Sequence, residues 1–337
     1  MKLGGFPEQL WRSRPRRAAF LILVLAALAT NIAAPPDPPP PGPAMAILSF
    51  EPVALDASAP DRRRVGALDY LGGWVLGSDS ARFGGLSSLH VEAGRVTALS
   101  DDGTLFRFAL PAGRGREPVR IDPLGDGPGP AIYKSNRDTE SMVLLGPWLW
   151  AGFEKHNMVW RYRRADLGAA AAARPALMQG WRANSGAEGM VRLADGRFLV
   201  FCECPSDDRP LSDVILFQGD PAGPGTSAAL LHYRRVPGYR VSDATLLPDG
   251  RLLILNRRFE WLEGFSLVVT IADARDLRPG EVIVPREVAR LQPPLTIDNM
   301  EGVSVTVENG RTTVWLVSDD NFSPLQRTLL LKFALVE

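Results

Sequence analysis

The sequence has no excess of either charge, because 38 Lys and Arg residues balance 38 Asp and Glu residues. Without a basic surplus nothing attracts the chain as a whole to a phosphate backbone, so we expect no nucleic-acid partner. Histidine and cysteine are also scarce, with three and two residues. No zinc signature, nucleotide-phosphate loop or dinucleotide fingerprint occurs, which excludes those classes of site.

Helical periodicity is missing as well. Beyond the N-terminus no long stretch carries apolar residues at helical spacing, whereas 32 Gly and 29 Pro are spread along the 337 residues. Such a distribution is typical of many tight turns. With 45% hydrophobic and 23% charged residues, the composition is that of a soluble globular protein. We therefore expect an all-β fold.

The N-terminus has its own organisation. Four arginines at positions 12–17 precede an apolar run at 18–29 and small residues at 33–34, which is the order of a secretory signal peptide. The alternative is an uncleaved anchor, since residues 18–34 reach the lower limit for crossing a bilayer. We assign residues 1–34 to a signal peptide or anchor, 35–43 to a Pro-rich linker and 44–337 to the folded domain. The protein is predicted to be exported, to the periplasm or cell envelope, with membrane contact only through this N-terminal segment.

The two cysteines, Cys202 and Cys204, are separated by one residue. Two thiolates without a second Cys or His pair make a poor metal site. A disulfide would close an unusually small ring. We therefore expect both cysteines to be packing residues.

A repeat runs through the remaining chain. Five segments share one layout, which is a small or acidic anchor, an apolar strand, a Gly-containing turn, a second apolar strand and a polar end. The anchors recur at a mean spacing of 54 residues, at Gly85, Glu140, Glu188, Asp243 and Glu301. The turns fall at Gly94, Gly146, Gly196, Gly250 and Gly310.

One or two further strand-like runs follow each segment, so every repeat supplies about four strands. This predicts a β-propeller of four-stranded antiparallel blades. Five repeats favour five blades, and six is the alternative because residues 47–55 form an additional candidate strand. The last repeat ends with its third strand at 328–336, so the N-terminal strand at 67–77 is predicted to supply the fourth and close the ring.

The polar ends of the repeats are predicted to meet, because the first strand of a blade starts at the rim where the second strand ends. Crowded carboxylates repel one another unless a cation lies among them. Oxygen donors suit Ca²⁺ better than Zn²⁺, and an ion-pair network is the alternative. The first strands contribute Ser87, Glu140, Glu188, Ser242, Asp243 and Glu301, and the second strands contribute Asp101, Asp102, Glu154, Lys155, Glu203, Arg257, Arg258, Asp319 and Asp320.

The motifs FGGLSSL, LSDDG, ESM, AEGM and MEGV, with the closing SDDNF, resemble the phytase-like β-propeller family known as "esterase-like activity of phytase". The resemblance covers roughly residues 66–337. More distantly, the layout is similar to the calcium-activated nucleotidases (apyrases), five-bladed propellers with an axial Ca²⁺. Carried over by position, the resemblance implies a Ca²⁺ held by Ser87, Glu140, Glu188, Ser242 or Asp243, and Glu301, of which we adopt Asp243 in the fourth repeat. That repeat departs most from the pattern, because basic residues stand where the others have an acid.

We therefore predict Ca²⁺-assisted hydrolysis of a small anionic or ester substrate, which is a phosphoester, phosphoanhydride or other ester. Asp101 or Asp102 would accept a proton, and the predicted substrate contacts are Lys155, Arg257, Arg258, Asp319 and Asp320. A serine-esterase site is disfavoured, because the second Gly of the G-x-S-x-G elbow is missing around Ser87.

The alternative function is a non-catalytic propeller that binds a ligand or protein in the cell envelope. Such a propeller would expose aromatic side chains on this face, although most Trp residues at strand positions are expected to lie in the core. The candidates are among Trp148, Trp150, Trp160, Trp181, Trp261, Phe259 and Phe322.

Overall fold

The computed structural model describes residues 42–204 and 209–336. They belong to one compact unit, Pro40–Glu337. The predicted signal or anchor segment and most of the Pro-rich linker lie outside the described residues. Within the described ranges, no helix has the length and apolar character needed to cross a membrane.

The described chain is all-β, as predicted. Its helical content is limited to two single 3₁₀ turns, η2 (Lys134–Asn136) and η3 (Ala176–Met178). The strands run apolar at consecutive positions where both faces are covered. In β13 (Phe198–Cys202), for example, all five residues are buried.

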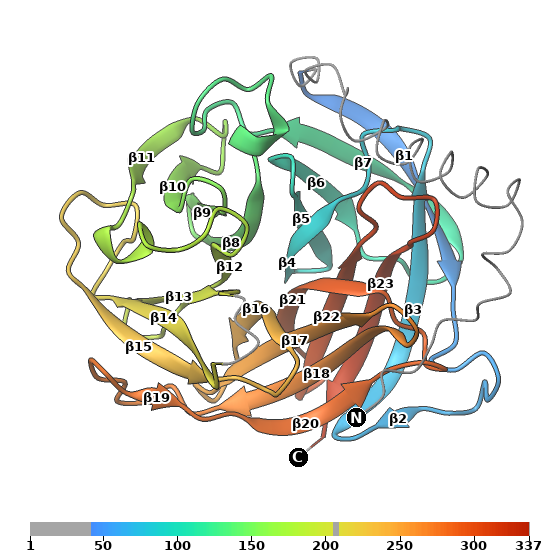
Figure 1. The fold of residues 1–337 in the computed structure, drawn as a ribbon. Coiled ribbons are helices and arrows are strands. Elements are labelled where there is room, and N and C mark those ends of the chain that lie inside the picture. Colours follow the sequence, from blue (N-terminus) through green and yellow to red (C-terminus); the bar gives the residue numbers. More distant parts are fainter. Residues whose placement is uncertain (1–41, 205–208, 337) are drawn as a thin grey trace, which may run out of the picture. The chain divides into compact units, whose positions relative to one another are not determined.

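The strands form five antiparallel groups of four, which we number in the order of their first strands (Figure 1). Group 1 consists of β4 (Leu86–Glu92), β5 (Arg95–Ser100), β6 (Thr104–Ala109) and β7 (Gly115–Pro123). Group 2 consists of β8 (Thr139–Leu145), β9 (Trp148–Phe153), β10 (Met158–Arg163) and β11 (Ala169–Ala173). Group 3 consists of β12 (Ala187–Arg192), β13, β14 (Leu211–Phe217) and β15 (Ala228–Arg234), with the short β19 (Val282–Ile283) parallel to β15.

Groups 4 and 5 complete the set. Group 4 consists of β16 (Arg240–Leu246), β17 (Leu252–Glu260), β18 (Gly264–Ala272) and β20 (Arg286–Leu291). Group 5 consists of β21 (Asn299–Glu308), β22 (Arg311–Asp319), β23 (Thr328–Leu335) and β3 (Leu68–Ser78). The short β2 (Arg64–Val65) pairs with β3.

The N-terminal strands β1 and β3 pair with strands of groups 1 and 5, which are the first and last groups along the chain. β3, at the position of the strand predicted at 67–77, pairs antiparallel with β23. The additional candidate strand at 47–55 corresponds to β1 (Ala44–Pro52). β1 pairs with β3 on one side and with β7 on the other, so groups 5 and 1 belong to one continuous sheet.

The turns between first and second strands fall at the predicted glycines. All five have positive φ, for example 75° at Gly94 and 93° at Gly196. This left-handed backbone carries no steric cost for glycine and a substantial one for other residues. The local sequence therefore determines where each inner hairpin reverses.

Serine side chains tie neighbouring groups together near the centre. The Oγ atoms of Ser87, Ser141 and Ser242 donate hydrogen bonds to carbonyl oxygens of the next group, at 2.6, 2.7 and 2.9 Å. These bonds run from β4 to Thr139, from β8 to Ala187 and from β16 to Met300. They connect group 1 to group 2, group 2 to group 3 and group 4 to group 5. The five first strands surround the centre of the unit in Figure 1.

The prediction for the cysteines is wrong. Cys202 and Cys204 form a disulfide, with their Cα atoms 5.0 Å apart. β13 ends at Cys202, and the backbone then turns, since Cys204 has a φ of 35°. This change of direction allows the two side chains to meet across a single intervening residue, Glu203.

Candidate metal centre in the central pocket

Each first strand contains a bulge at the same place in the repeat. The pairing of first and second strands skips one residue in all five groups, and a bulge of this kind redirects the side chain out of the regular ladder. The skipped residues are Ser87, Glu140, Glu188, Ser242 and Glu301. We call these the bulge positions.

A second repeated position lies on the neighbouring strand. The residue before each bulge pairs with a residue on the second strand. The residue that follows this partner lies opposite the residue two places before the bulge, as Arg257 does to Arg240 and Asp319 to Asn299. The residues that follow the partners are Asp101, Glu154, Glu203, Arg257 and Asp319. We call these the second-strand positions.

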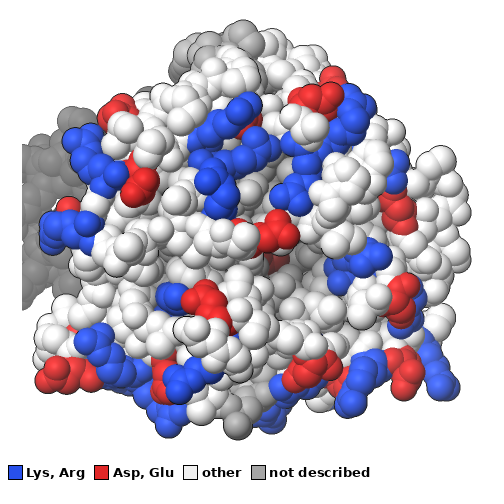
Figure 2. All heavy atoms as spheres, turned by 180° about the vertical axis from the view of Figure 1, so that it is seen from behind, with Lys and Arg blue, Asp and Glu red and all other residues white. Residues whose placement is uncertain are grey.

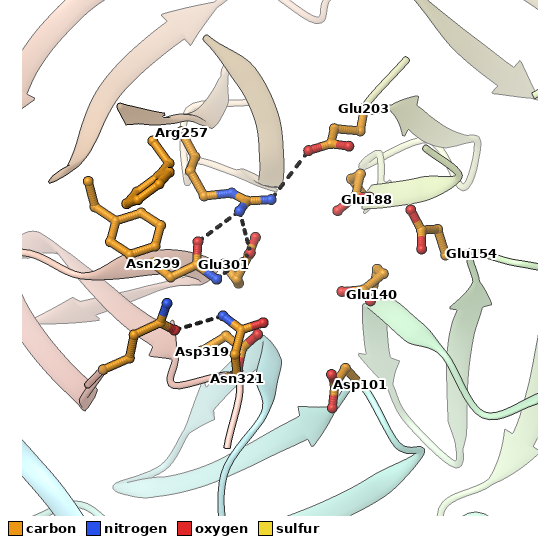
Figure 3. Close-up of a pocket in the computed structure, with 13 residues that line it drawn as sticks. Asp101, Glu140, Glu154, Glu188, Glu203, Arg257, Asn299, Glu301, Asp319 and Asn321 are labelled. Carbon is orange, nitrogen blue, oxygen red and sulfur yellow. Dashed lines mark hydrogen bonds and ion pairs between the residues drawn. The ribbon is translucent and has the colours of Figure 1, made fainter. Parts of the chain in front are cut away.

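Eight of these ten side chains line one pocket of about 410 Å³, the central pocket (Figure 3). Only the two serines are not part of its lining. The pocket therefore contains seven carboxylates and one guanidinium. Its complete lining is Asp101, Glu140, Glu154, Glu188, Glu203, Arg257, Phe259, Phe265, Asn299, Glu301, Asp319, Asn321 and Gln326.

The carboxylate oxygens are closest together between groups 2 and 3. One set, from Asp138, Glu140 and Glu154, has oxygens within 4.8 Å of one another, and so does a second set from Glu154, Glu188 and Glu203. Glu154 belongs to both sets. Carboxylate oxygens are the donor type that Ca²⁺ prefers.

Burial and mutual repulsion raise the pKa values of these acids. Burial, followed by the charges of Asp138 and Glu203, raises the pKa of Glu154 to about 7. The pKa of Glu188 lies well above its usual value, because this side chain is buried and faces Glu203 and Glu140. Burial and the neighbouring Asp101 raise the pKa of Asp319 to about 7. Without a cation, the pocket therefore holds protons near neutral pH.

Arg257 balances part of this charge. Its guanidinium contacts Glu301 at 3.1 Å and Glu203 at 3.3 Å, and donates to Asn299 Oδ1 at 2.8 Å. Burial alone would lower the pKa of Arg257, but the two glutamates raise it above its usual value. Even so, burial raises the pKa of Glu301 to about 8, so one guanidinium does not neutralise the pocket.

Two observations favour a hard cation in this pocket. Glu301 Oε2 is buried and has no hydrogen-bond partner among the described residues. The Glu301 side chain is only 8% exposed. No His or Cys occurs in the lining, so the donor set suits Ca²⁺ and not Zn²⁺. The chemistry of the residues therefore fits the predicted ion.

The structure brings half of the predicted site residues together. Among the predicted ligands and the predicted catalytic and substrate contacts, the central pocket contains Glu140, Glu188, Glu301, Asp101, Asp319 and Arg257.

Ser87 and Asp243, the other predicted ligands, are placed differently. Ser87 occupies a bulge position, but its hydroxyl donates to carbonyl oxygens of Thr139 and Leu99. The Asp243 carboxylate accepts hydrogen bonds from the backbone N–H groups of Ala244 and Val303, both at 2.8 Å. In group 4 the bulge position belongs to Ser242, so Asp243 points into the strand ladder and not into the central pocket.

Four other predicted residues lie outside the pocket lining. Asp102 and Asp320 accept backbone hydrogen bonds in their own loops, from Thr104 and Phe322. Lys155 lies 3.5 Å from Asp138, beside the acids. Arg258 pairs with Glu263 at 2.7 Å, because it follows Arg257 on the strand and its side chain points to the opposite face.

Sequence reasoning missed Asp138 as a member of the acid cluster and did not assign Glu154 and Glu203 to the metal. Glu154 and Glu203 occupy the same second-strand position in successive repeats, so the repeat pattern contained the information needed to assign them. Nothing in the repeat pattern indicated Asp138, which precedes the first residue of β8.

The central pocket differs from the outer surface in its charge. Figure 2 shows Lys, Arg, Asp and Glu side chains together on the face seen from behind. In the pocket acidic residues predominate, so carboxyl groups are concentrated at one place of a chain whose charges balance overall.

Solved structures with a similar arrangement include β-propellers. The glutaminyl cyclase of Myxococcus xanthus is 12% identical, with a TM-score of 0.44, over 80% of this chain and 97% of the cyclase. The WD40 β-propeller domain of Doa1 is also 12% identical, with a TM-score of 0.43, over 80% of this chain and 97% of that domain. No curated protein matches the chain.

The family comparison covers most of the described unit. Residues 81–322 match the phytase-like family, described as "Esterase-like activity of phytase". This range includes all ten bulge and second-strand positions. The chain is a β-propeller that belongs to the phytase-like family.

Proposed function

We propose that the protein is a Ca²⁺-assisted hydrolase whose substrate is a phosphoester, phosphoanhydride or other ester. The observation that carries this proposal is the central pocket, where seven carboxylates face a single guanidinium. Membership of a family described by esterase-like activity supports it. The buried Glu301 Oε2, which no described residue contacts by a hydrogen bond, supports it as well.

The residues suited to hold the cation are those of the two oxygen clusters. These are Asp138, Glu140, Glu154, Glu188 and Glu203. A bound Ca²⁺ would supply Lewis acidity toward the oxygen of a phosphoryl or carbonyl group. The bulges hold Glu140 and Glu188 on strands rather than on loops, which limits their movement when a substrate arrives.

The other side of the pocket supplies groups for proton transfer and anion binding. Asp101 lines the pocket and lies 2.6 Å from Lys134 Nζ. We assign Asp101 as the base that accepts a proton from the attacking water at a carboxylate oxygen. Arg257 would stabilise negative charge that develops on the substrate.

We further propose that the five strand groups are five blades and that β3 closes the ring. The pairing of β3 with β23 and the single bulge position in each group support this count. We also infer export. The basic and apolar order of the N-terminal residues and the Cys202–Cys204 disulfide support an oxidising compartment outside the cytoplasm.

Hydrolysis of p-nitrophenyl phosphate and p-nitrophenyl acetate, measured in Ca²⁺ and in EGTA, tests the proposed activity. We expect turnover only with Ca²⁺ and a loss of about 100-fold or more in Asp101→Asn. Asp102→Asn is the matched control, because Asp102 only accepts a backbone bond from Thr104. If Ca²⁺ binds but neither ester is cleaved, the result would favour the alternative, a binding propeller.

A further inference from the structure

The central pocket has two chemically different walls. Groups 1, 2, 3 and 5 contribute carboxylates, whereas group 4 contributes Arg257, Phe259 and Phe265. In Figure 3 Arg257 lies on the side of the pocket opposite Glu154. A ligand that fills the pocket therefore meets acids on one side and aromatic rings on the other.

The aromatic wall is built by one extended hairpin. β17 has nine residues, whereas the equivalent β13 has five. Phe259 on β17 and Phe265 on β18 are directly paired in the ladder. Their ring centroids lie 4.8 Å apart at an interplanar angle of 48°. The extra length of this hairpin carries both rings beyond the level of the bulge positions.

This wall is not part of the hydrophobic core. Phe259 is 52% exposed and does not belong to any of the five buried clusters of the described unit. Leaving an aromatic ring in water forgoes the free energy of burying it. An exposed ring that lines a pocket is therefore suited to cover the apolar part of a ligand.

Amide side chains continue the wall from group 5. Asn321 Nδ2 donates to Gln326 Oε1 at 2.7 Å, and both residues line the pocket. Amide side chains carry both donors and acceptors, which suits polar substituents of a ligand. Arg257 Nε, on the same side, is buried and has no hydrogen-bond partner among the described residues.

We propose that the substrate carries an aromatic ring that packs on Phe259 and Phe265, with polar ring substituents directed to Asn321 and Gln326. Its ester or phosphoryl group then faces the carboxylate wall. The inference rests on the proposed function and names the substrate class of the same pocket, aryl esters. A volume of about 410 Å³ is in the lower part of the range for small-molecule sites, roughly 300–1,000 Å³, which suits a single ring with its reacting group.

Two pairs of non-hydrolysable probes test the aromatic wall with the full-length chain. Phenylphosphonate and methylphosphonate are compared by calorimetry in Ca²⁺. Benzamide and acetamide, which need no cation, are compared by ligand-observed NMR in EGTA. We expect the aryl member of each pair to bind about tenfold tighter or more.

Variants test whether the rings of Phe259 and Phe265 cause the tighter binding of the aryl probes. Phe259→Ala and Phe265→Ala should remove most of the aryl preference, and Phe259→Tyr should retain it. Trp261→Ala is the matched control, because Trp261 lies at the tip of the same hairpin, is 87% exposed and does not line the pocket.

The outcomes separate this inference from the proposed function. If neither aryl probe binds better than its partner, or if the preference survives in both alanine variants, the aromatic wall is not a ring site. If benzamide binds through Phe259 but Ca²⁺ does not bind, the ring site stands and the Ca²⁺-assisted hydrolase is contradicted.

Discussion

Groups 3 and 4 place different residues on the same backbone frame. At the bulge and second-strand positions group 3 has Glu188 and Glu203, whereas group 4 has Ser242 and Arg257. The bulge geometry and strand pairing are shared, so the fold supplies the two positions and the residues supply the chemistry. A propeller repeat can thus form an acidic wall in one group and a cationic, aromatic wall in the next.

The comparison also separates two kinds of buried carboxylate. Burial raises the pKa of both Glu188 and Asp243 well above the usual values. Asp243 accepts two backbone hydrogen bonds, which act to lower its pKa, whereas Glu188 faces other carboxylates, which raise its pKa further. Asp243 is therefore a structural group and Glu188 a candidate ligand. The following predictions test this distinction, from the largest expected effect to the smallest.

Glu154→Gln should cause the largest loss of Ca²⁺ affinity, because Glu154 belongs to both oxygen clusters. Even outer-shell changes weaken metal binding by about 10–100-fold, so the loss of a shared charged ligand should reach at least that range. Calorimetric titration with Ca²⁺ measures it. Asp249→Asn is the control, since Asp249 lies in an exposed turn and pairs with Arg251. Equal affinities in the two variants would remove Glu154 from the site.

Arg257→Met should raise the affinity for Ca²⁺, whereas Glu154→Gln should lower it. Without the guanidinium, Glu301 loses its ion-pair partner and Glu203 retains the more distant Arg240 at 3.5 Å, so the protein in EGTA should lose about 3 kcal/mol of unfolding free energy. Its Ca²⁺ affinity should rise, because a competing positive charge is gone. Urea denaturation in EGTA and in Ca²⁺ tests both parts. A variant that binds Ca²⁺ more weakly would show that Arg257 supports the metal site instead of competing with it.

Stability without Ca²⁺ should fall as the pH rises from about 5 to 8. The pKa values of Glu154, Asp319 and Glu301 are raised to about 7, 7 and 8, so the folded state binds more protons than the unfolded state in this range. Its unfolding free energy therefore decreases with rising pH. In Ca²⁺ the trend should reverse, because deprotonated carboxylates bind the ion better. Melting temperatures at pH 5.5 and 8.0, with EGTA and with Ca²⁺, check this. Parallel trends in the two conditions would contradict it.

Asp243→Asn should have the smallest effect on the pocket. Asparagine keeps one acceptor oxygen for the N–H groups of Ala244 and Val303 but places an amide N–H₂ at the other, so we expect a loss of about 1–2 kcal/mol in unfolding free energy. Ca²⁺ affinity should stay within about twofold of wild type. A large loss of affinity, measured by the same titration, would return Asp243 to the ligand set.

The repeat and its turns were predictable because they depend on local residues. The glycines at the inner hairpins require positive φ, and the apolar runs require burial on both faces, so both are visible in the sequence. The strand at 67–77 was predictable because the last repeat lacked a fourth strand.

The site was predictable only in part, because a bulge shifts the register by one residue. This shift is why Asp243 was preferred over Ser242, and it depends on strand pairing that the local sequence does not reveal. The aromatic wall was only partly visible. Phe259 was named among aromatic residues that a binding surface would expose, but the length of the β17–β18 hairpin that carries it follows from tertiary packing.

The melting temperature of the full-length chain in EGTA and in millimolar Ca²⁺ tests the central claim most directly, when wild type is compared with Glu188→Gln. A ligand that binds only the folded state stabilises it by mass action. We predict that Ca²⁺ raises the melting temperature of wild type by several degrees and that Glu188→Gln abolishes most of this rise. No change with Ca²⁺ in wild type would contradict a cation site in the central pocket.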